Sequence, residues 1–218
     1  MRDVVRDAEF FGRWMAATAV SVEREADRLT ELDSPIGDAD HGSNLLRGFL
    51  AVRAEIDAQR PPSPGAVLQL AGRTLIAVVG GASGPLYGTL LRRTGKELGD
   101  AVEVSDEQVR KALYAGVGAV AQLGGAAPGD KTMLDALVPG VAELSTSYRA
   151  AAGAAEGGAL ATVPLQARKG RASYLGARSI GHQDPGATSA ALLLRALADT
   201  ADAADAADAA DGPAEEGR

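Results

Sequence analysis

The chain has 218 residues, of which 46% are hydrophobic, and this is enough for one domain with its own core. Its formal net charge is −7, but residues 199–218 alone carry −6, because they hold five Asp and two Glu against one Arg. The remainder is nearly neutral, which excludes a basic nucleic-acid surface or a polybasic membrane patch, and the absence of cysteine excludes disulfides, thiolate metal sites and a cysteine nucleophile.

Other features of the composition favour a helical protein inside the cell. Aromatic residues make up only 4% of the chain, and the apolar residues are mainly Ala, Leu and Val, which suit close-packed helices better than a sheet. No hydrophobic run is long enough to cross a bilayer, and residues 1–7 lack the apolar core of a signal peptide. We therefore expect a cytoplasmic protein with neither a nucleic-acid nor a membrane partner.

The first predicted helix runs from about Phe11 to Leu32. Apolar residues return there every three or four positions, with charged residues between them, which is typical of an amphipathic helix. Pro35 and Gly37 end it, since proline disfavours helix in the residue before it and glycine permits turn dihedrals.

Three carboxylates crowd the turn after this helix, those of Asp33, Asp38 and Asp40. Ordinary turn and capping chemistry explains one or two of them, but not three like charges. Carboxylate oxygens are ligands of hard divalent cations, and Mg²⁺ typically takes one or two of them besides water and phosphate oxygens. The spacing does not fit a calcium-binding EF-hand loop, because Gly42 stands where a ligand is needed. The turn therefore predicts a metal and phosphate site.

Further helices are predicted downstream, with no strand, because no stretch shows sustained alternation of apolar and polar residues. The short breaks between most of them favour antiparallel neighbours, and thus an all-α bundle of seven or eight helices. The predicted helices cover about residues 43–57, 65–79, 87–98, 105–123, 131–150 and 187 onward.

The glycine-rich turn 80–84 opens one of these helices. Exposed N–H groups at a helix N-terminus attract anions, so a phosphate cradle is one interpretation and a plain helix junction is the other. It is neither a Walker loop, since no Lys-Ser or Lys-Thr follows in place, nor a Rossmann loop, since no strand precedes it.

Glycine, proline and aspartate recur at the breaks before the helices from 43, 87, 131 and 187. In an up-and-down bundle alternate junctions lie at the same end, so these four are expected to line one pocket together.

Two kinds of basic residue are open to two interpretations. His41 and His182, the only histidines, are either structural or in contact with phosphate. The run 168–171 is either a solvated helix end or a source of positive charge for a nucleotide. No Ser-His-Asp order can be made, so hydrolysis through a covalent intermediate is not supported.

Taken together, the motifs resemble those of the nucleotide-binding L subunit of dihydroxyacetone kinase. They occur in order across about residues 10–198, which makes the resemblance far more specific than any single glycine loop. The motifs are Ile36–Gly42, Gly80–Leu86, Pro128–Met133, Gln166–Gly176 and Arg178–Ser189.

The resemblance implies an eight-helix antiparallel up-and-down barrel over residues 1–198, followed by an acidic low-complexity tail at 199–218. It implies ADP or ATP at one end of the barrel and two Mg²⁺ ions held by Asp33, Asp38 and Asp40. Phosphate-side contacts are expected from His41, Gly42, Ser43, Asn44, Ala82 and Ser83. Contacts to the rest of the nucleotide are expected from Gly124, Met133, Arg171, Asp184, Pro185 and Gly186.

The resemblance further implies a phosphotransferase that is active only with partners. A separate K subunit would hold dihydroxyacetone, and an M subunit of the phosphotransferase system, a phosphohistidine protein, would rephosphorylate the bound ADP in place. No catalytic residue is assigned to this chain, because placement and charge neutralisation by the metal do most of the work in such transfers. The length of the chain and its lack of K-like sequence favour this phosphotransferase-system version, in which the subunits are separate chains.

Two alternatives stay open. One is a subunit of an ATP-dependent kinase for dihydroxyacetone or a related short ketose or polyol, and the other is a nucleotide-sensing regulatory module without transfer activity. The chain also departs from the family pattern at Pro35 and Ala177, where acidic residues are more common. Pro164 falls in a segment expected to be helical, which it should kink or restart.

Overall fold

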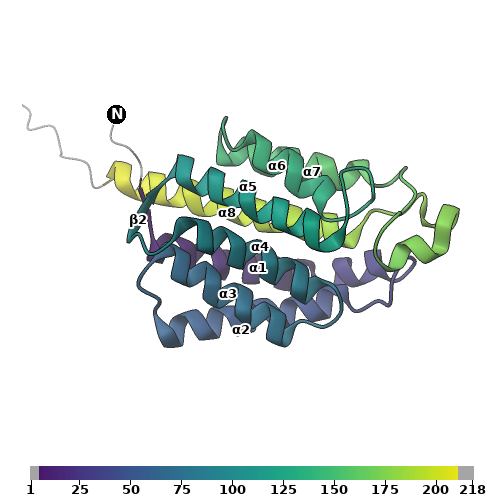
Figure 1. Cartoon of the computed structure of the whole chain (residues 1–218), viewed down its shortest axis with the longest axis horizontal. Helices are drawn as coiled ribbons and strands as arrows, with labels where there is room; N and C mark the ends of the chain where they lie inside the picture. Colours follow the sequence, from purple (N-terminus) through teal and green to yellow (C-terminus); the bar gives the residue numbers. More distant parts are fainter. Residues whose placement is uncertain (1–4, 211–218) are drawn as a thin grey trace, which may run out of the picture.

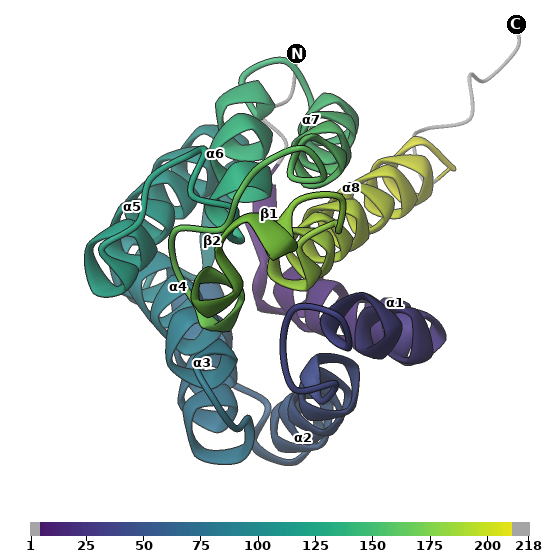
Figure 2. The same cartoon turned by 90° about the vertical axis from the view of Figure 1, so that its right-hand side faces the viewer.

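A computed structural model describes residues 5–210, in which α-helices form a closed ring in chain order (Figures 1 and 2). Each helix packs on the next, and α8 packs on α1 to close the ring. The predicted all-α, eight-helix antiparallel barrel is confirmed. Its helices are α1 Ala8–Asp33, α2 His41–Gln59, α3 Pro64–Val78, α4 Ser83–Leu98, α5 Asp106–Gly124, α6 Leu134–Glu143, α7 Tyr148–Ala161 and α8 Pro185–Ala210, with a 3₁₀ helix, η1, at Arg171–Ser179.

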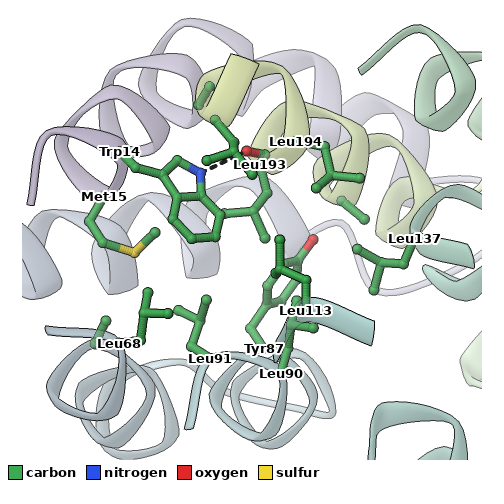
Figure 3. Close-up of a cluster of buried hydrophobic side chains, with 14 of the residues drawn as sticks. Trp14, Met15, Leu68, Tyr87, Leu90, Leu91, Leu113, Leu137, Leu193 and Leu194 are labelled. Carbon is green, nitrogen blue, oxygen red and sulfur yellow. Dashed lines mark hydrogen bonds between the residues drawn. The ribbon is translucent and has the colours of Figure 1, made fainter. Parts of the chain in front are cut away.

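The interior of the barrel is a continuous apolar core. Trp14 on α1 is fully buried, and its indole Nε1 donates a hydrogen bond to the carbonyl of Leu193 on α8 at 2.9 Å (Figure 3). Leucines from α3, α4 and α5 meet these two helices across the barrel (Figure 3). Because the core occupies the middle of the ring, a polar cavity inside the barrel can form only at its ends. None of the helices within residues 5–210 combines the length and the apolarity that a bilayer crossing requires.

The single helix predicted at 131–150 is wrong, since this region contains α6 and α7 with a turn between them. Ser147 adopts an extended backbone, and its side chain accepts a hydrogen bond from the N–H of Ala150, which starts α7. Residues 151–161, which belong to none of the predicted helices, are part of α7, whose buried face is made of alanines. If 131–150 were one helix, alternation would place the junction before α8 at the opposite end; the division into α6 and α7 places it at the same end as the other three.

The absence of strands was also a wrong prediction. β1 (Val5–Asp7) and β2 (Glu103–Ser105) form a two-stranded antiparallel sheet in which Arg6 lies opposite Val104. Strands of three residues are too short to show an alternating pattern. Pro164 kinks no helix either, because α7 ends at Ala161 and the chain is already in a turn.

Two arginines hold the start of the acidic segment against the barrel. Arg6 is buried and pairs with Asp106 of α5 at 2.9 Å and with Asp205 of α8 at 2.8 Å. Arg149 of α7 pairs with Asp199 at 2.9 Å and also with Asp202. The expected domain boundary at 199 therefore falls inside α8. Residues 211–218 lie outside the described residues, so the extent of a tail stays a prediction.

Replacing Arg6 with Met is expected to lower the free energy of unfolding by about 2 kcal/mol, because it removes both ion pairs and the stacking of the guanidinium 4.8 Å from the Phe10 ring centroid. Asp106 and Asp205 are about half exposed, so the loss of stability stays below that expected for a fully buried ion pair. Urea unfolding measures it. The control is Arg13→Met, which breaks an exposed pair with Glu9 and should cost less than about 0.5 kcal/mol. Equal losses in the two variants would contradict this account of Arg6.

Candidate nucleotide and metal site

Four interhelical connections converge on a cavity of about 400 Å³ at the end of the barrel seen in Figure 2. They are the α1–α2 turn, the α3–α4 turn, the α5–α6 loop and residues 163–184 between α7 and α8, which we call the cap segment. The prediction that these four junctions share one pocket is thus confirmed. β1 and β2 lie at the opposite end of the barrel (Figure 1).

The three aspartates of the α1–α2 turn lie together at the mouth of this cavity. Each of Asp33, Asp38 and Asp40 offers a carboxylate oxygen, and these oxygens all lie within 4.8 Å of one another. Asp33 ends α1 and is buried, whereas the other two are exposed. Three hard oxygen donors at this spacing fit a Mg²⁺ ion, which requires such ligands and keeps room for water and phosphate oxygens.

The backbone of the turn holds Asp33 in place. Its Oδ2 accepts hydrogen bonds from the N–H groups of Asp40 at 3.1 Å and His41 at 3.3 Å. A Cβ on Gly37 would lie 1.9 Å from Asp33 Oδ1, so only glycine leaves room for the carboxylate. Ala39 has a φ of 58°, a conformation that non-glycine residues rarely adopt. A strained and crowded turn of this kind is typical of a functional site.

Arg171 of η1 reaches across the cavity to this turn, where its guanidinium lies 3.0 Å from Asp38 Oδ2. One cation against three carboxylates leaves the turn with a net charge of −2, before the charges of the other lining residues are counted. Lys169 also lines the cavity, and it lies close to the α5–α6 loop, since a Cβ on Gly125 would be 3.7 Å from its Nζ. The cap segment therefore brings positive charge to the metal turn.

His41 is buried at the start of α2 and joins α4 to α8. Its Nε2 lies 2.8 Å from Ser189 Oγ, and its Nδ1 lies 3.3 Å from Ser83 Oγ. Ser189 Oγ donates to the carbonyl of Gly186 at 3.1 Å and also lies 2.7 Å from Tyr87 Oη.

A neutral imidazole has one donor and one acceptor nitrogen, so His41 donates to one of these two serine hydroxyls and accepts from the other. Burial lowers the pKa of His41, although the nearby carboxylates of Asp33 and Asp40 oppose the shift. His41 is therefore neutral near pH 7 and orients Ser83 at the edge of the cavity.

Asp184 lines the cavity and directly precedes the first residue of α8. Its Oδ2 accepts a hydrogen bond from the N–H of Ala187 at 2.7 Å, and its own N–H donates to Thr162 Oγ1 at 2.9 Å. Burial raises the pKa of its carboxyl group to about 7, although the N–H of Ala187 and the ammonium of Lys131 oppose the shift.

This pKa predicts a pH-dependent stability. An Asp in the unfolded chain ionises at about 3.9. Since the folded pKa of Asp184 is higher, the unfolded state loses this proton first, and the contribution of Asp184 to stability falls as the pH rises from about 4 to about 7. Asp184→Asn keeps an oxygen for Ala187 and removes the charge, so it should melt higher than the wild type at about pH 8 and equally at about pH 4. Thermal unfolding without metal or nucleotide tests this, and an equal difference at both pH values would contradict it.

Part of the cavity wall is apolar. Met133, which is 5% exposed, lines the cavity together with Leu86 and Leu123. A flat aromatic base packs well on such side chains, and methionine adapts its shape to them. The cavity thus combines a polar end suited to phosphates and metal with an apolar end suited to a base.

Most of the sequence-predicted site residues line this cavity, but three do not. Gly42 packs against α1, where a Cβ would lie 1.9 Å from the carbonyl oxygen of Ala26. Ser43 is exposed and donates to the carbonyl of Asp40, and Asn44 accepts a hydrogen bond from Arg47 at 2.6 Å. The predicted residues that line the cavity are Asp33, Asp38, Asp40, His41, Ala82, Ser83, Gly124, Met133, Arg171, Asp184, Pro185 and Gly186.

Several residues that line the cavity are not among the predicted site residues. Lys131 lies in the motif Pro128–Met133 but has no predicted role. Tyr87 and Leu86 follow the glycine turn directly, and the helical periodicity of α4 would have placed Tyr87 on its inner face.

Comparisons with known proteins show what this chain is similar to. The sequence pattern of the DAK2 domain matches residues 35–199. The chain is 43% identical over 195 residues to the PEP-dependent dihydroxyacetone kinase, ADP-binding subunit DhaL, of Escherichia coli, covering 85% of this chain and 93% of that protein. It is 40% identical over 210 residues to the corresponding subunit of PEP-dependent dihydroxyacetone kinase 2 of Listeria innocua, covering 91% and 97%.

A solved structure shares the fold. The dihydroxyacetone kinase of C. freundii, in complex with AMP-PNP and Mg²⁺, aligns with a TM-score of 0.70 and 27% sequence identity. The alignment covers 91% of this chain and 35% of the kinase, so the barrel corresponds to about a third of that longer protein.

Proposed function

The chain belongs to the DAK2 domain family, as an L-type nucleotide-binding subunit of dihydroxyacetone kinase, and from this we propose that it binds ADP with Mg²⁺ and passes a phosphoryl group to dihydroxyacetone on a partner. One observation carries the proposal: three carboxylates within 4.8 Å of one another lie at the mouth of a cavity that has an apolar wall. The resemblance implies two Mg²⁺ ions at this turn, and we include this number in the proposal.

Different groups of residues would bind the metal, the phosphates and the base of the nucleotide. Asp33, Asp38 and Asp40 would hold the metal, which when bound offsets the negative charge of the phosphates. Ser83 lies at the N-terminus of α4, where free N–H groups and the positive end of the helix dipole favour a phosphate. Met133 and its apolar neighbours would receive the base.

The chain's own part in the transfer is to bind and orient. The turn, the start of α4 and the cap segment would fix the terminal phosphate at the end of the barrel, and exclude water from the side that the cap segment covers. The proposed acceptor, dihydroxyacetone, would be held by a K subunit. The proposed donor is an M subunit of the phosphotransferase system, which would rephosphorylate ADP in place in the cytoplasm. The names of the relatives, which are ADP-binding subunits of PEP-dependent kinases, support this division of labour.

Reconstitution tests the proposal. The purified chain is combined with a K subunit, dihydroxyacetone and ADP, and the phosphoryl donor is either phosphorylated M subunit or ATP. Product formed in repeated turnovers only with phosphorylated M supports the proposal. Repeated turnover with ATP alone selects the ATP-dependent kinase, and failure of both donors with intact nucleotide binding selects the sensing module.

A further inference from the structure

We propose that Lys131 is a positioning residue of the nucleotide site: its ammonium group fixes the cap segment over the cavity and thereby sets how long the nucleotide stays bound. The inference concerns a residue to which neither the sequence motifs nor the comparisons give a role. Its second half rests on the proposed function.

The cap segment has little regular structure of its own. Between α7 and α8 it contains η1, which is interrupted at Gly176. Its Ala167 and Ala172 form, with Ile36 of the α1–α2 turn, a satellite apolar cluster outside the main core. Its residues 169–172 line the cavity. A connection of this length needs specific contacts to hold one shape.

Lys131 makes three such contacts with the cap segment. The side chain is 1% exposed, and its Nζ donates to the carbonyl oxygens of Leu165 at 3.0 Å, Ser179 at 2.6 Å and His182 at 2.5 Å. Leu165 lies near the beginning of the cap segment, and Ser179 and His182 lie near its end. One ammonium group thus ties the two ends of the segment together and attaches them to the α5–α6 loop.

The same contacts exclude a direct role on phosphate. An ammonium group has three N–H donors, and here all three are directed to backbone carbonyls. Lys131 lines the cavity, but it has no donor left for a ligand, unlike the lysine of a phosphate-binding loop. Lys131 also has a φ of 63°, a backbone conformation that residues other than glycine rarely adopt.

The far side of the cap segment reaches the metal turn. Ile36 of that turn packs with Ala167 and Ala172 in the satellite apolar cluster, and Arg171 pairs with Asp38. The cap segment therefore bridges the cavity, held by Lys131 on one side and by the metal turn on the other. A nucleotide beneath it cannot leave on that side unless one of these attachments opens.

Lys131→Met tests the proposal, because it keeps an unbranched side chain only one atom shorter and removes all three donors. Without any ligand, trypsin should cut the cap segment after Arg168, Lys169 or Arg171 about tenfold faster than in the wild type, as identified by fragment mass. A fluorescent ADP analogue bound with Mg²⁺ should dissociate about tenfold faster in a chase experiment. Lys96→Met, at an exposed position on α4, is the control and should change neither rate.

A second variant covers the case in which Lys131→Met does not fold. Ser179 is buried, and its Oγ accepts from the N–H of Ala167 at 2.9 Å and donates to the carbonyl of Gly176 at 2.6 Å. Ser179→Ala loosens the same segment from within and should raise both rates in the same direction.

The proposal is overturned if the folded variants are cut at the wild-type rate, or are cut faster but release the nucleotide at the wild-type rate. Failure of the proposed function looks different, because the wild type itself then binds no nucleotide while the trypsin readout still reports on Lys131.

Discussion

The double substitution Asp38→Asn and Asp40→Asn is expected to weaken binding of ADP in the presence of Mg²⁺ by about 100-fold or more. Asparagine keeps the shape of both side chains but removes two of the three charges that would hold the metal. Without Mg²⁺ the variant should melt at the wild-type temperature or slightly above it, because neighbouring like charges no longer repel. Calorimetric titration and thermal unfolding measure the two effects.

The matched control for this variant is Asp27→Asn with Asp57→Asn, which removes the same charge from exposed positions on α1 and α2. It should bind ADP as the wild type does. If the control loses as much affinity as the double variant in the turn, the effect is one of net charge and the turn is not a metal site. A large fall in melting temperature of the turn variant would instead indicate a structural role for these carboxylates.

Gly42→Ala is expected to lower the free energy of unfolding by about 3 kcal/mol, because the added methyl group would lie 1.9 Å from the carbonyl oxygen of Ala26 and 2.6 Å from Thr30 Oγ1. Neither atom can retreat without separating α1 from α2. The resemblance assigns Gly42 to the phosphates, whereas the structure makes it a packing residue at the base of the metal turn. Urea unfolding measures the loss.

Gly153→Ala is the control, since this residue lies inside α7 and a Cβ there would meet no atom within 4 Å. Alanine has the higher helix propensity, so this variant should gain up to about 1 kcal/mol. A Gly42→Ala variant as stable as the wild type, but unable to bind ADP, would favour the phosphate contact over the packing role.

Local patterns in the sequence predicted much of the fold and of the site. The periodicity of apolar residues and the Gly and Pro punctuation located most helices, because each helix has one buried face and ends where glycine or proline permits a turn. The boundary between α6 and α7 was missed because Ser147 acts through one capping hydrogen bond in a stretch that is otherwise apolar and small. The shared pocket follows from the alternation of junctions once α6 and α7 are counted as two helices.

Contacts between distant parts of the chain could not be predicted from the sequence. Lys131 meets carbonyls 34 to 51 residues away, and carbonyls carry no sequence signal. The pairing of Arg171 with Asp38 likewise depends on how the cap segment crosses the cavity. The placement of Gly42 against α1 required the angle between two helices, which periodicity does not give. Which motif residues share a cavity is thus predictable, and the residues that position them are not.

Titration of the purified wild-type chain with ADP, once with millimolar Mg²⁺ and once with EDTA, tests the central claim most directly. The claim is that the turn of Asp33, Asp38 and Asp40 holds Mg²⁺ against the phosphates of a nucleotide in the cavity. It predicts saturable binding with Mg²⁺ and an affinity about 100-fold weaker, or no binding, with EDTA, because the carboxylates alone repel the phosphates. Equal affinity under the two conditions, or no binding under either, would contradict it.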